Sequence, residues 1–426
     1  MIKNKFQLSG LIFLLVLTMA FGGLFSEMAV AQEKVTVGVI GPFTGPNARV
    51  GSEIWRSYNM AFNEIDNTIG DYKVELVKID SESQPEKATR NYTQAVTRKG
   101  VDVTTFNWHS SVSVALMDMA AKYEIPHFFG GAATQVILDK YHESPEKYQY
   151  YDSGKFWPTP KKLSIAYVTT LTEAVEAGEW DPETKNVAIY GENTDWGRSF
   201  GDSIAKQFEE AGWNIVSKDY FEMKKTKFFP LIQKWKDKKV SIIAGTSTVP
   251  ASFAALVKQA REVGLKSLVI ADGLGWMGEW YDLAGDASDY VLDQIPQWAS
   301  EEAKQFRKRF IEEWDAEPSA SSSGLAYDGA NYLIKILRKT YQLYGEINSE
   351  NIQKVNHYLV RTGDLTFTEG ILMKEYKYTP DTVPDPKVAK DYYIYPVIQY
   401  HGGEGTVIWP QDWAEGDFKI PPYMEE

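Results

Sequence analysis

The 426-residue sequence contains no cysteine, so disulfide bonds and thiolate metal sites are excluded. It also lacks the lipid-modified cysteine that tethers a bacterial lipoprotein to a membrane. A protein without disulfides depends on its hydrophobic core, and 43% of the residues are hydrophobic. The chain exceeds one domain, since a domain takes about 150 residues on average.

Basic residues are also fewer than acidic residues. The sequence has 45 Lys and Arg residues against 58 Asp and Glu residues, which gives a formal net charge of −13 at pH 7. A negative protein repels the phosphates of nucleic acids and of anionic membrane surfaces. The composition therefore predicts that neither of these is a partner.

Long hydrophobic runs are missing except at the N-terminus, where two lysines precede the apolar residues 8–25. Small residues follow at 29–31, and then charged ones. This order is typical of a secretory signal peptide covering residues 1–31, with cleavage after about Ala31. The alternative is an uncleaved membrane anchor, because the run is just long enough to span a bilayer. Together with the missing lipid-anchor cysteine, this predicts an exported protein that is free in the periplasm.

Strand-like and helix-like segments alternate along the rest of the chain. Connections of this length between parallel strands require right-handed crossovers, so the pattern predicts an α/β fold with two doubly wound parallel-sheet lobes. The predicted strands are 34–40, 72–80, 101–106, 125–129, 186–190, 215–221, 241–245, 267–272, 370–378 and 391–400, and the predicted helices are 53–66, 85–98, one starting near 110, 200–211, 229–235, 251–263, 301–314 and 324–344.

Two breaks interrupt this alternation. Residues 141–160 are rich in aromatic rings and proline but show no period, and a second break falls at 293–296. We interpret both as crossovers between lobes. The predicted domains are lobe 1 at 32–152 and 297–365, and lobe 2 at 153–296 and 366–426.

Four loops that follow strands carry glycine, hydroxyl or aromatic residues, and ligands of open parallel sheets bind at such strand ends. In one of them, Ser110 or Ser111 falls at the start of a helix, where free N–H groups and the positive helix end meet a hydroxyl. This favours a carboxylate-binding site, although a serine that merely caps its own helix is the alternative. The four loops are GPFTGPNARVG (41–51), NWHSS (107–111), GGAAT (130–134) and DGLGW (272–276).

The sequence gives little support for catalysis, metal binding or cofactor binding. His109 precedes Ser110, but adjacent residues do not place a base behind a nucleophile, and the G-x-S-x-G elbow is absent. The five histidines lack metal-ligand spacing. The glycines of residues 41–51 match neither a dinucleotide fingerprint nor a phosphate loop. The sequence therefore predicts no catalytic residue, no metal and no cofactor.

Several motifs occur in an order that resembles a known family. They are GPFTG (41–45), the two serines before a helix, AAT (132–134), TDWG (194–197) and SGLAYDGANYLI (323–334). The sequence resembles the branched-chain amino acid binding proteins, which are type I periplasmic binding proteins that serve ABC importers. The resemblance covers nearly the whole mature chain. It implies two lobes joined by three hinge crossovers, which close over a small solute.

The resemblance also implies roles for individual residues of the first lobe. The family's carboxylate-binding serine falls on Ser110 or Ser111. Its pair of backbone and hydroxyl contacts falls on Ala132 and Thr134. These four residues are the predicted carboxylate end of the site.

In the second lobe, the resemblance places the family's closing aromatic residue on Trp196 and its acidic partner for an ammonium group near Asp272. Trp108 and Trp276 add rings that depart from the family pattern. Such a pocket suits an aromatic or larger solute, or a methylated amine held by cation–π contacts worth about 0.5–2 kcal/mol each. The alternative is that Trp276 and Trp280 pack into the core of the second lobe.

The sequence thus predicts a non-enzymatic periplasmic solute-binding protein. It captures a small amino acid, or a related carboxylated or amine solute, by hinge closure and delivers it to an inner-membrane ABC permease. The alternative is an exported sensor that presents its solute to a membrane signalling receptor. Both functions use the same lobes, so the sequence leaves both open.

Overall fold

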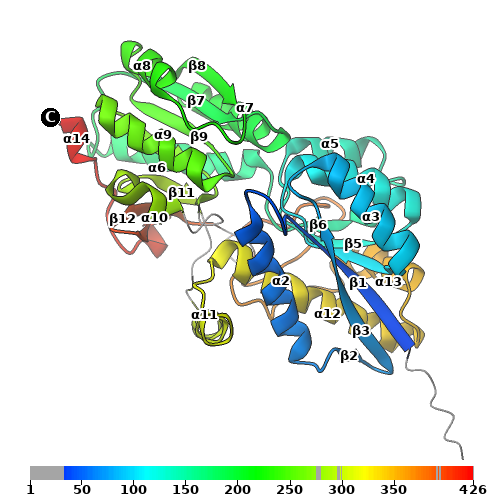
Figure 1. Ribbon diagram of the computed structural model, residues 1–426. Coiled ribbons are helices and arrows are strands. Elements are labelled where there is room, and N and C mark those ends of the chain that lie inside the picture. Colours follow the sequence, from blue (N-terminus) through cyan, green and yellow to red (C-terminus); the bar gives the residue numbers. More distant parts are fainter. Residues whose placement is uncertain are drawn as a thin grey trace, which may run out of the picture.

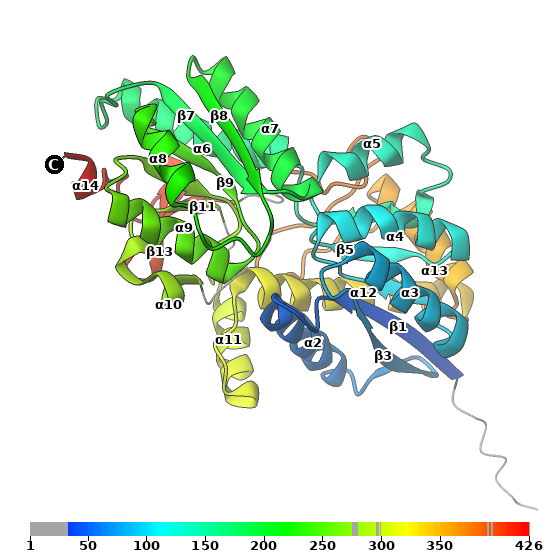
Figure 2. The same ribbon diagram turned by 45° about the horizontal axis from the view of Figure 1, so that its top comes forward.

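The computed structural model describes residues 33–274, 280–294, 298, 300–389, 392 and 395–425. They form two α/β lobes, each built on one mostly parallel sheet (Figures 1 and 2). This confirms the predicted fold class. The predicted signal peptide and Trp276 lie outside the described residues. No helix within the ranges above is long and apolar enough to cross a membrane.

The sheet of the first lobe has the strand order β2-β3-β1-β4-β5-β6, and all neighbours are parallel except β2 and β3. The chain moves from β1 to β3 on one side and then crosses to β4 on the other. The strand order therefore reverses between β1 and β4. The strands are β1 (Glu33–Gly41), β2 (Thr68–Ile69), β3 (Tyr72–Asp80), β4 (Val103–Thr105), β5 (His127–Gly130) and β6 (Ser153–Lys155).

The sheet of the second lobe has the order β13-β12-β11-β10-β9-β7-β8 and is parallel from β8 to β11. Here the reversal lies between β7 and β9, because β8 and β9 flank the first strand of the lobe. The strands are β7 (Asn186–Glu192), β8 (Asn214–Phe221), β9 (Ile242–Thr246), β10 (Leu268–Ala271), β11 (Leu292–Gln294), β12 (Val397–His401) and β13 (Glu404–Trp409).

Helices cover both faces of each sheet, as the alternation of strand side chains requires. In β7, Val187 and Ile189 belong to one buried cluster with α6 and α7, whereas Ala188 and Tyr190 belong to the cluster of α8 and α9. In the first lobe, α2 and α12 pack together, and so do α3 and α4. The helices are α2 (Ala48–Asn63), α3 (Pro85–Lys99), α4 (Ser110–Tyr123), α5 (Gln135–Glu143), α6 (Pro160–Glu176), α7 (Asp195–Glu210), α8 (Phe229–Asp237), α9 (Pro250–Val263), α10 (Trp280–Ala284), α11 (Glu301–Trp314), α12 (Leu325–Tyr344), α13 (Ser349–Val355) and α14 (Pro422–Glu425).

The strand predicted at 370–378 is wrong. Apart from one isolated bridge between Phe367 and Tyr376, the segment forms no strand pairing. The buried carboxylate of Asp328 in α12 takes the place of a neighbouring strand, because it accepts hydrogen bonds from the N–H groups of Ile371 (2.7 Å) and Leu372 (3.3 Å). The hydroxyl of Tyr376 donates to the same carboxylate at 2.6 Å. Burial raises the pKa of Asp328 to about 7.

The chain passes between the lobes three times, after β6, after β11 and before β12. Residues 367–385, which were predicted to belong to lobe 2, make hydrogen bonds to the first lobe instead, as in the bond from the Tyr378 hydroxyl to the carbonyl oxygen of Lys155 (2.7 Å). At the end of this segment, Asp385 is fully buried beside Lys155, with 2.7 Å between Nζ and Oδ1. Its other oxygen accepts from the N–H group of Thr159 (3.2 Å) and from Lys162 (3.1 Å) at the start of α6. Asp385 thus joins the first and third crossovers.

We expect Lys155→Met to lower the free energy of unfolding by about 3 kcal/mol, because it removes one partner of a buried ion pair. Urea denaturation followed by circular dichroism measures this loss. The matched control is Lys161→Met at an exposed position, which we expect to change stability by less than about 0.5 kcal/mol. Equal losses in the two variants would show that the buried pair does not stabilise the crossovers.

Candidate ligand-binding site

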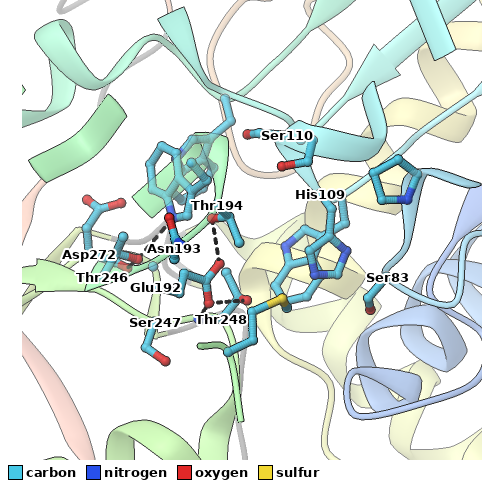
Figure 3. Close-up of a pocket in the computed structure, with 18 residues that line it drawn as sticks. Ser83, His109, Ser110, Glu192, Asn193, Thr194, Thr246, Ser247, Thr248 and Asp272 are labelled. Atoms are coloured by element: carbon cyan, nitrogen blue, oxygen red, sulfur yellow. Dashed lines mark hydrogen bonds between the residues drawn. The ribbon is translucent and has the colours of Figure 1, made fainter. Parts of the chain in front are cut away.

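A cavity of about 280 Å³ lies between the two lobes (Figure 3). Its first-lobe wall comes from the segments that follow β3, β4, β5 and β6, and its second-lobe wall from those that follow β7, β8, β9 and β10. Carboxyl ends of strands therefore face the cavity from both sides. The order of each sheet reverses next to this point, which is where open α/β sheets bind ligands.

The loop after β4 brings four consecutive residues, 108–111, to the cavity wall. The backbone turns sharply before them, since Phe106 and Asn107 have φ angles of 60° and 147°. The fully buried Phe106 ring packs on Phe156, with 5.3 Å between ring centroids, and so anchors the turned backbone. Helix α4 then begins at Ser110, and the side chain of its N-cap residue, His109, makes no capping hydrogen bond.

Ser110 and Ser111 both lie on the wall, as predicted, in the first turn of α4. The Ser110 hydroxyl oxygen accepts hydrogen bonds from the N–H groups of Ala133 (3.2 Å) and Thr134 (3.3 Å), so it ties two loops of the first lobe together. The Ser111 hydroxyl oxygen accepts from the N–H group of Asp195 in the second lobe, at 3.3 Å. Each hydroxyl keeps its own proton for donation.

Ala132 and Thr134 are buried behind the wall, and Gly131 takes the place on the cavity that was expected for Ala132. The Thr134 hydroxyl donates to the carbonyl oxygen of Asp195 at 3.2 Å, and it accepts from the N–H group of Val136 to cap α5. In this arrangement Thr134 joins the lobes.

Glu192, the last residue of β7, lies on the second-lobe wall and was not predicted from the sequence. It is 1% exposed. One carboxylate oxygen accepts from the N–H group (2.9 Å) and the hydroxyl (2.8 Å) of Thr248, and the other from the hydroxyl of Thr194 (3.1 Å; Figure 3). Burial raises the pKa of Glu192, and these hydrogen bonds oppose the rise. The signal available in the sequence was a carboxylate at the end of a strand, two residues before the TDWG motif.

The TDWG motif fits closely against Glu192. Thr194 caps α7 by accepting from the N–H group of Gly197 at 3.1 Å. A Cβ atom at Gly197 would lie 2.1 Å from the carbonyl oxygen of Glu192, so only glycine allows this approach. Trp196 lines the cavity as predicted, and its indole N–H donates to the Thr246 hydroxyl at 2.9 Å, which fixes the ring.

Asp272 also lies on the wall, as predicted, with 1% exposure. The hydroxyl of Tyr167 donates to one of its carboxyl oxygens at 2.9 Å. Burial raises the pKa of Asp272 well above its ordinary value, the negative charge of Asp293 adds to the rise, and the Tyr167 hydrogen bond opposes it. This environment favours the neutral carboxyl, which is a poor partner for an ammonium group.

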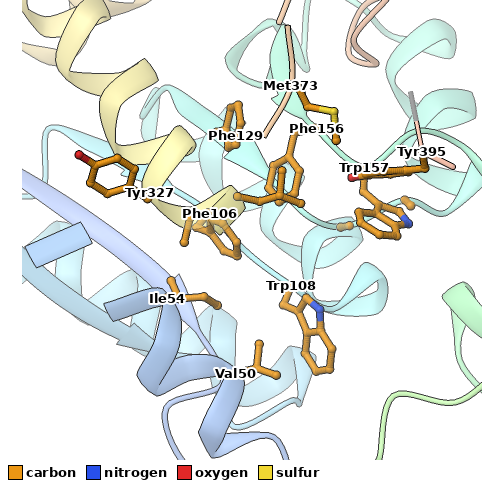
Figure 4. Close-up of a cluster of buried hydrophobic side chains, with 14 of the residues drawn as sticks. Val50, Ile54, Phe106, Trp108, Phe129, Phe156, Trp157, Tyr327, Met373 and Tyr395 are labelled. Atoms are coloured by element: carbon orange, nitrogen blue, oxygen red, sulfur yellow. The ribbon is translucent and has the colours of Figure 1, made fainter. Parts of the chain in front are cut away.

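Three indole rings line the cavity, those of Trp108, Trp157 and Trp196. Trp157 follows β6 in the first crossover and was not predicted as a site residue. It packs against Tyr395 from the third crossover, with 4.4 Å between ring centroids (Figure 4). The buried Trp280 instead packs in the second-lobe core, 5.1 Å from the ring of Tyr400.

No lysine or arginine is present among the described residues of the wall. Burial lowers the pKa of His109 to about 4, so its imidazole is neutral at physiological pH. No group of three or more His, Cys, Asp or Glu side chains in the described ranges is arranged to hold a metal ion. The cavity therefore combines a carboxylate, hydroxyls and indole rings around a small solute.

Comparison with known proteins places this arrangement in context. A model of the family "Periplasmic binding protein" matches residues 34–359. The chain is 22% identical, over 85% of its length and 92% of the relative's, to the leucine-, isoleucine-, valine-, threonine-, and alanine-binding protein of Pseudomonas aeruginosa.

Solved structures share the fold. One is a putative branched-chain amino acid ABC transporter from Silicibacter pomeroyi (TM-score 0.75, 19% identity, covering 92% of this chain and 100% of that one). Another is a solute binding protein of an ABC transporter from Rhodopseudomonas palustris in complex with 3,4-dihydroxy benzoic acid (TM-score 0.68, 20% identity, covering 86% of this chain and 93% of that one).

The raised pKa of Asp272 predicts a pH-dependent stability. The folded protein keeps a proton on this carboxyl that the unfolded chain releases above about pH 4, so the stability contribution of Asp272 falls as the pH rises toward the folded-state pKa. We expect Asp272→Asn to gain stability relative to the wild type between about pH 5 and pH 8. Urea denaturation across this range measures the gain. For the exposed control Asp282→Asn we expect no such trend, and parallel profiles for Asp272→Asn and the wild type would contradict the assignment.

Proposed function

The chain belongs to the periplasmic binding protein family, and from this premise we propose that it is the periplasmic substrate-binding component of an ABC importer. It captures a small amino acid or a related amine or carboxylated solute and delivers it to an inner-membrane permease. The observation that carries the proposal is the cavity enclosed by the strand ends of two facing lobes. A wall of hydroxyls, two carboxyl groups and three indoles suits the binding of a small polar solute.

Hinge closure is the proposed mechanism, supported by the contacts between the lobes. The first turn of α7 packs against the starts of α4 and α5 (Figure 2). Asp195 receives a hydrogen bond from Thr134 and donates one to Ser111, and the N–H group of Gln135 donates to the Ser199 hydroxyl at 3.0 Å. These few bonds exist only when the lobes meet. A solute that contacts both walls adds to them and shifts the population toward the closed form.

Binding and closure can be tested together. We expect at least one compound from a panel of leucine, phenylalanine, 4-hydroxybenzoate, choline and glycine betaine to raise the melting temperature without being converted. The same compound should reduce the radius of gyration in small-angle X-ray scattering, because the lobes rotate together on binding. Binding without compaction would contradict hinge closure.

Ser111→Ala combined with Thr134→Ala should lower the affinity for that compound roughly thirtyfold, because two hydrogen bonds of about 1 kcal/mol each that hold the closed form are lost. Isothermal titration calorimetry measures the change. The matched control combines Ser144→Ala with Thr368→Ala at exposed positions, and we expect it to bind like the wild type. Unchanged affinity in the first double variant would show that these hydroxyls do not contribute to closure.

A further inference from the structure

We propose that the cavity selects solutes that carry a cationic amine, and that the Glu192 carboxylate balances this charge while the indoles of Trp108, Trp157 and Trp196 enclose it. The inference rests on the solute-binding function proposed above and names the solute class. It also replaces Asp272, the acidic partner expected from the sequence, with Glu192.

The charges of the wall support a cation. Its ionisable residues are Glu192, Asp272 and His109, and no lysine or arginine of the described wall offers a positive charge. A solute with a carboxylate alone would place a second negative charge beside the buried Glu192 without a counter-charge. A buried carboxylate without a counter-charge is unfavourable even when it is hydrogen-bonded, and a cationic solute removes that penalty.

Hydrogen bonding distinguishes the two acids. Three donors from Thr194 and Thr248 point at the carboxylate of Glu192, and such donors stabilise its charged form. An ionised carboxylate accepts about four hydrogen bonds, so acceptor capacity remains for the N–H groups of an ammonium. Asp272 receives one donor, from Tyr167, and lies near the negative charge of Asp293, which favours its neutral form.

Most hydrogen-bond donors of the predicted carboxylate site already donate to acceptors within the protein. The N–H groups of Ala133 and Thr134 donate to the Ser110 hydroxyl oxygen, and the Thr134 hydroxyl donates to Asp195. The N-terminal N–H groups of α4 and the hydroxyl protons of Ser110 and Ser111 remain for a neutral or anionic acceptor on the solute. A carboxylate on the solute is therefore tolerated, whereas the amine is required.

The indoles supply the rest of the recognition. The faces of tryptophan rings attract cations that lie within about 6 Å of the ring centroid, and quaternary ammonium groups are recognised by cages of such rings. Trp108 and Trp157 come from the first lobe and Trp196 from the second, so the three rings surround a solute only when the lobes are closed. Hydrogen bonding of the Trp196 N–H to Thr246 leaves the ring face, rather than the N–H group, available to the solute.

The test compares pairs of compounds that share a shape but differ in the amine. The pairs are choline with 3,3-dimethyl-1-butanol and phenylalanine with 3-phenylpropionate, each titrated calorimetrically into the full chain. We expect the amine of at least one pair to bind at least tenfold more tightly than its analogue. Glu192→Gln should reduce that preference to less than threefold, whereas the matched control Glu209→Gln, at an exposed position of α7 outside the cavity, should retain it. Melting temperatures and circular dichroism of both variants verify folding.

The outcomes separate this inference from the proposed function. Binding of 3-phenylpropionate or 3,3-dimethyl-1-butanol as tight as that of its amine partner would overturn the cation requirement and leave solute binding intact. A preference for the amine that survives in a folded Glu192→Gln protein would overturn the role of Glu192. Failure of these four compounds together with the earlier panel would count against the solute-binding function itself.

Discussion

The site depends on one contact, the docking of the first turn of α7 against the first lobe. The backbone of Asp195 is hydrogen-bonded on both sides, to the hydroxyls of Ser111 and Thr134. The same turn holds the Glu192 carboxylate through Thr194, and Gly197 brings it against the backbone of Glu192. One short stretch, residues 192–197, thus makes the lobe contact and part of the cavity wall.

Much of the fold follows from sequence because buried parallel strands leave a strong local pattern, as in the strand predicted at 72–80, which matches β3 (Tyr72–Asp80). The strand predicted at 370–378 was wrong because a distant side chain, Asp328, satisfies its backbone groups, and no local pattern reveals that. Helix α2 begins at Ala48, before the predicted 53, although its N-cap residue Asn47 makes no side-chain capping hydrogen bond.

The site could be predicted in part for a related reason. Ser110 and Trp196 lie in segments that follow predicted strands, and both line the cavity. Their positions could be predicted because the cavity lies at the carboxyl ends of the strands. Glu192 was not found, because whether the last residue of a strand points into a cavity depends on its neighbours in the sheet. The high tryptophan content was also ambiguous, since Trp180 and Trp213 stack on each other in the second-lobe core, 5.6 Å apart, and do not serve the site.

The buried cluster around Asp385 bears on the mechanics of the molecule. Asp385 binds Lys155 at the end of the first-lobe sheet and Lys162 at the start of a second-lobe helix, so two of the three connections are fastened to each other. Connections that are fastened together cannot lengthen or twist independently. In the hinge closure proposed above, this link favours a swing of the lobes about an axis near the cluster. Under the proposed function, such a swing would bring the same wall residues together at every closure, so the cavity would have one shape for each solute.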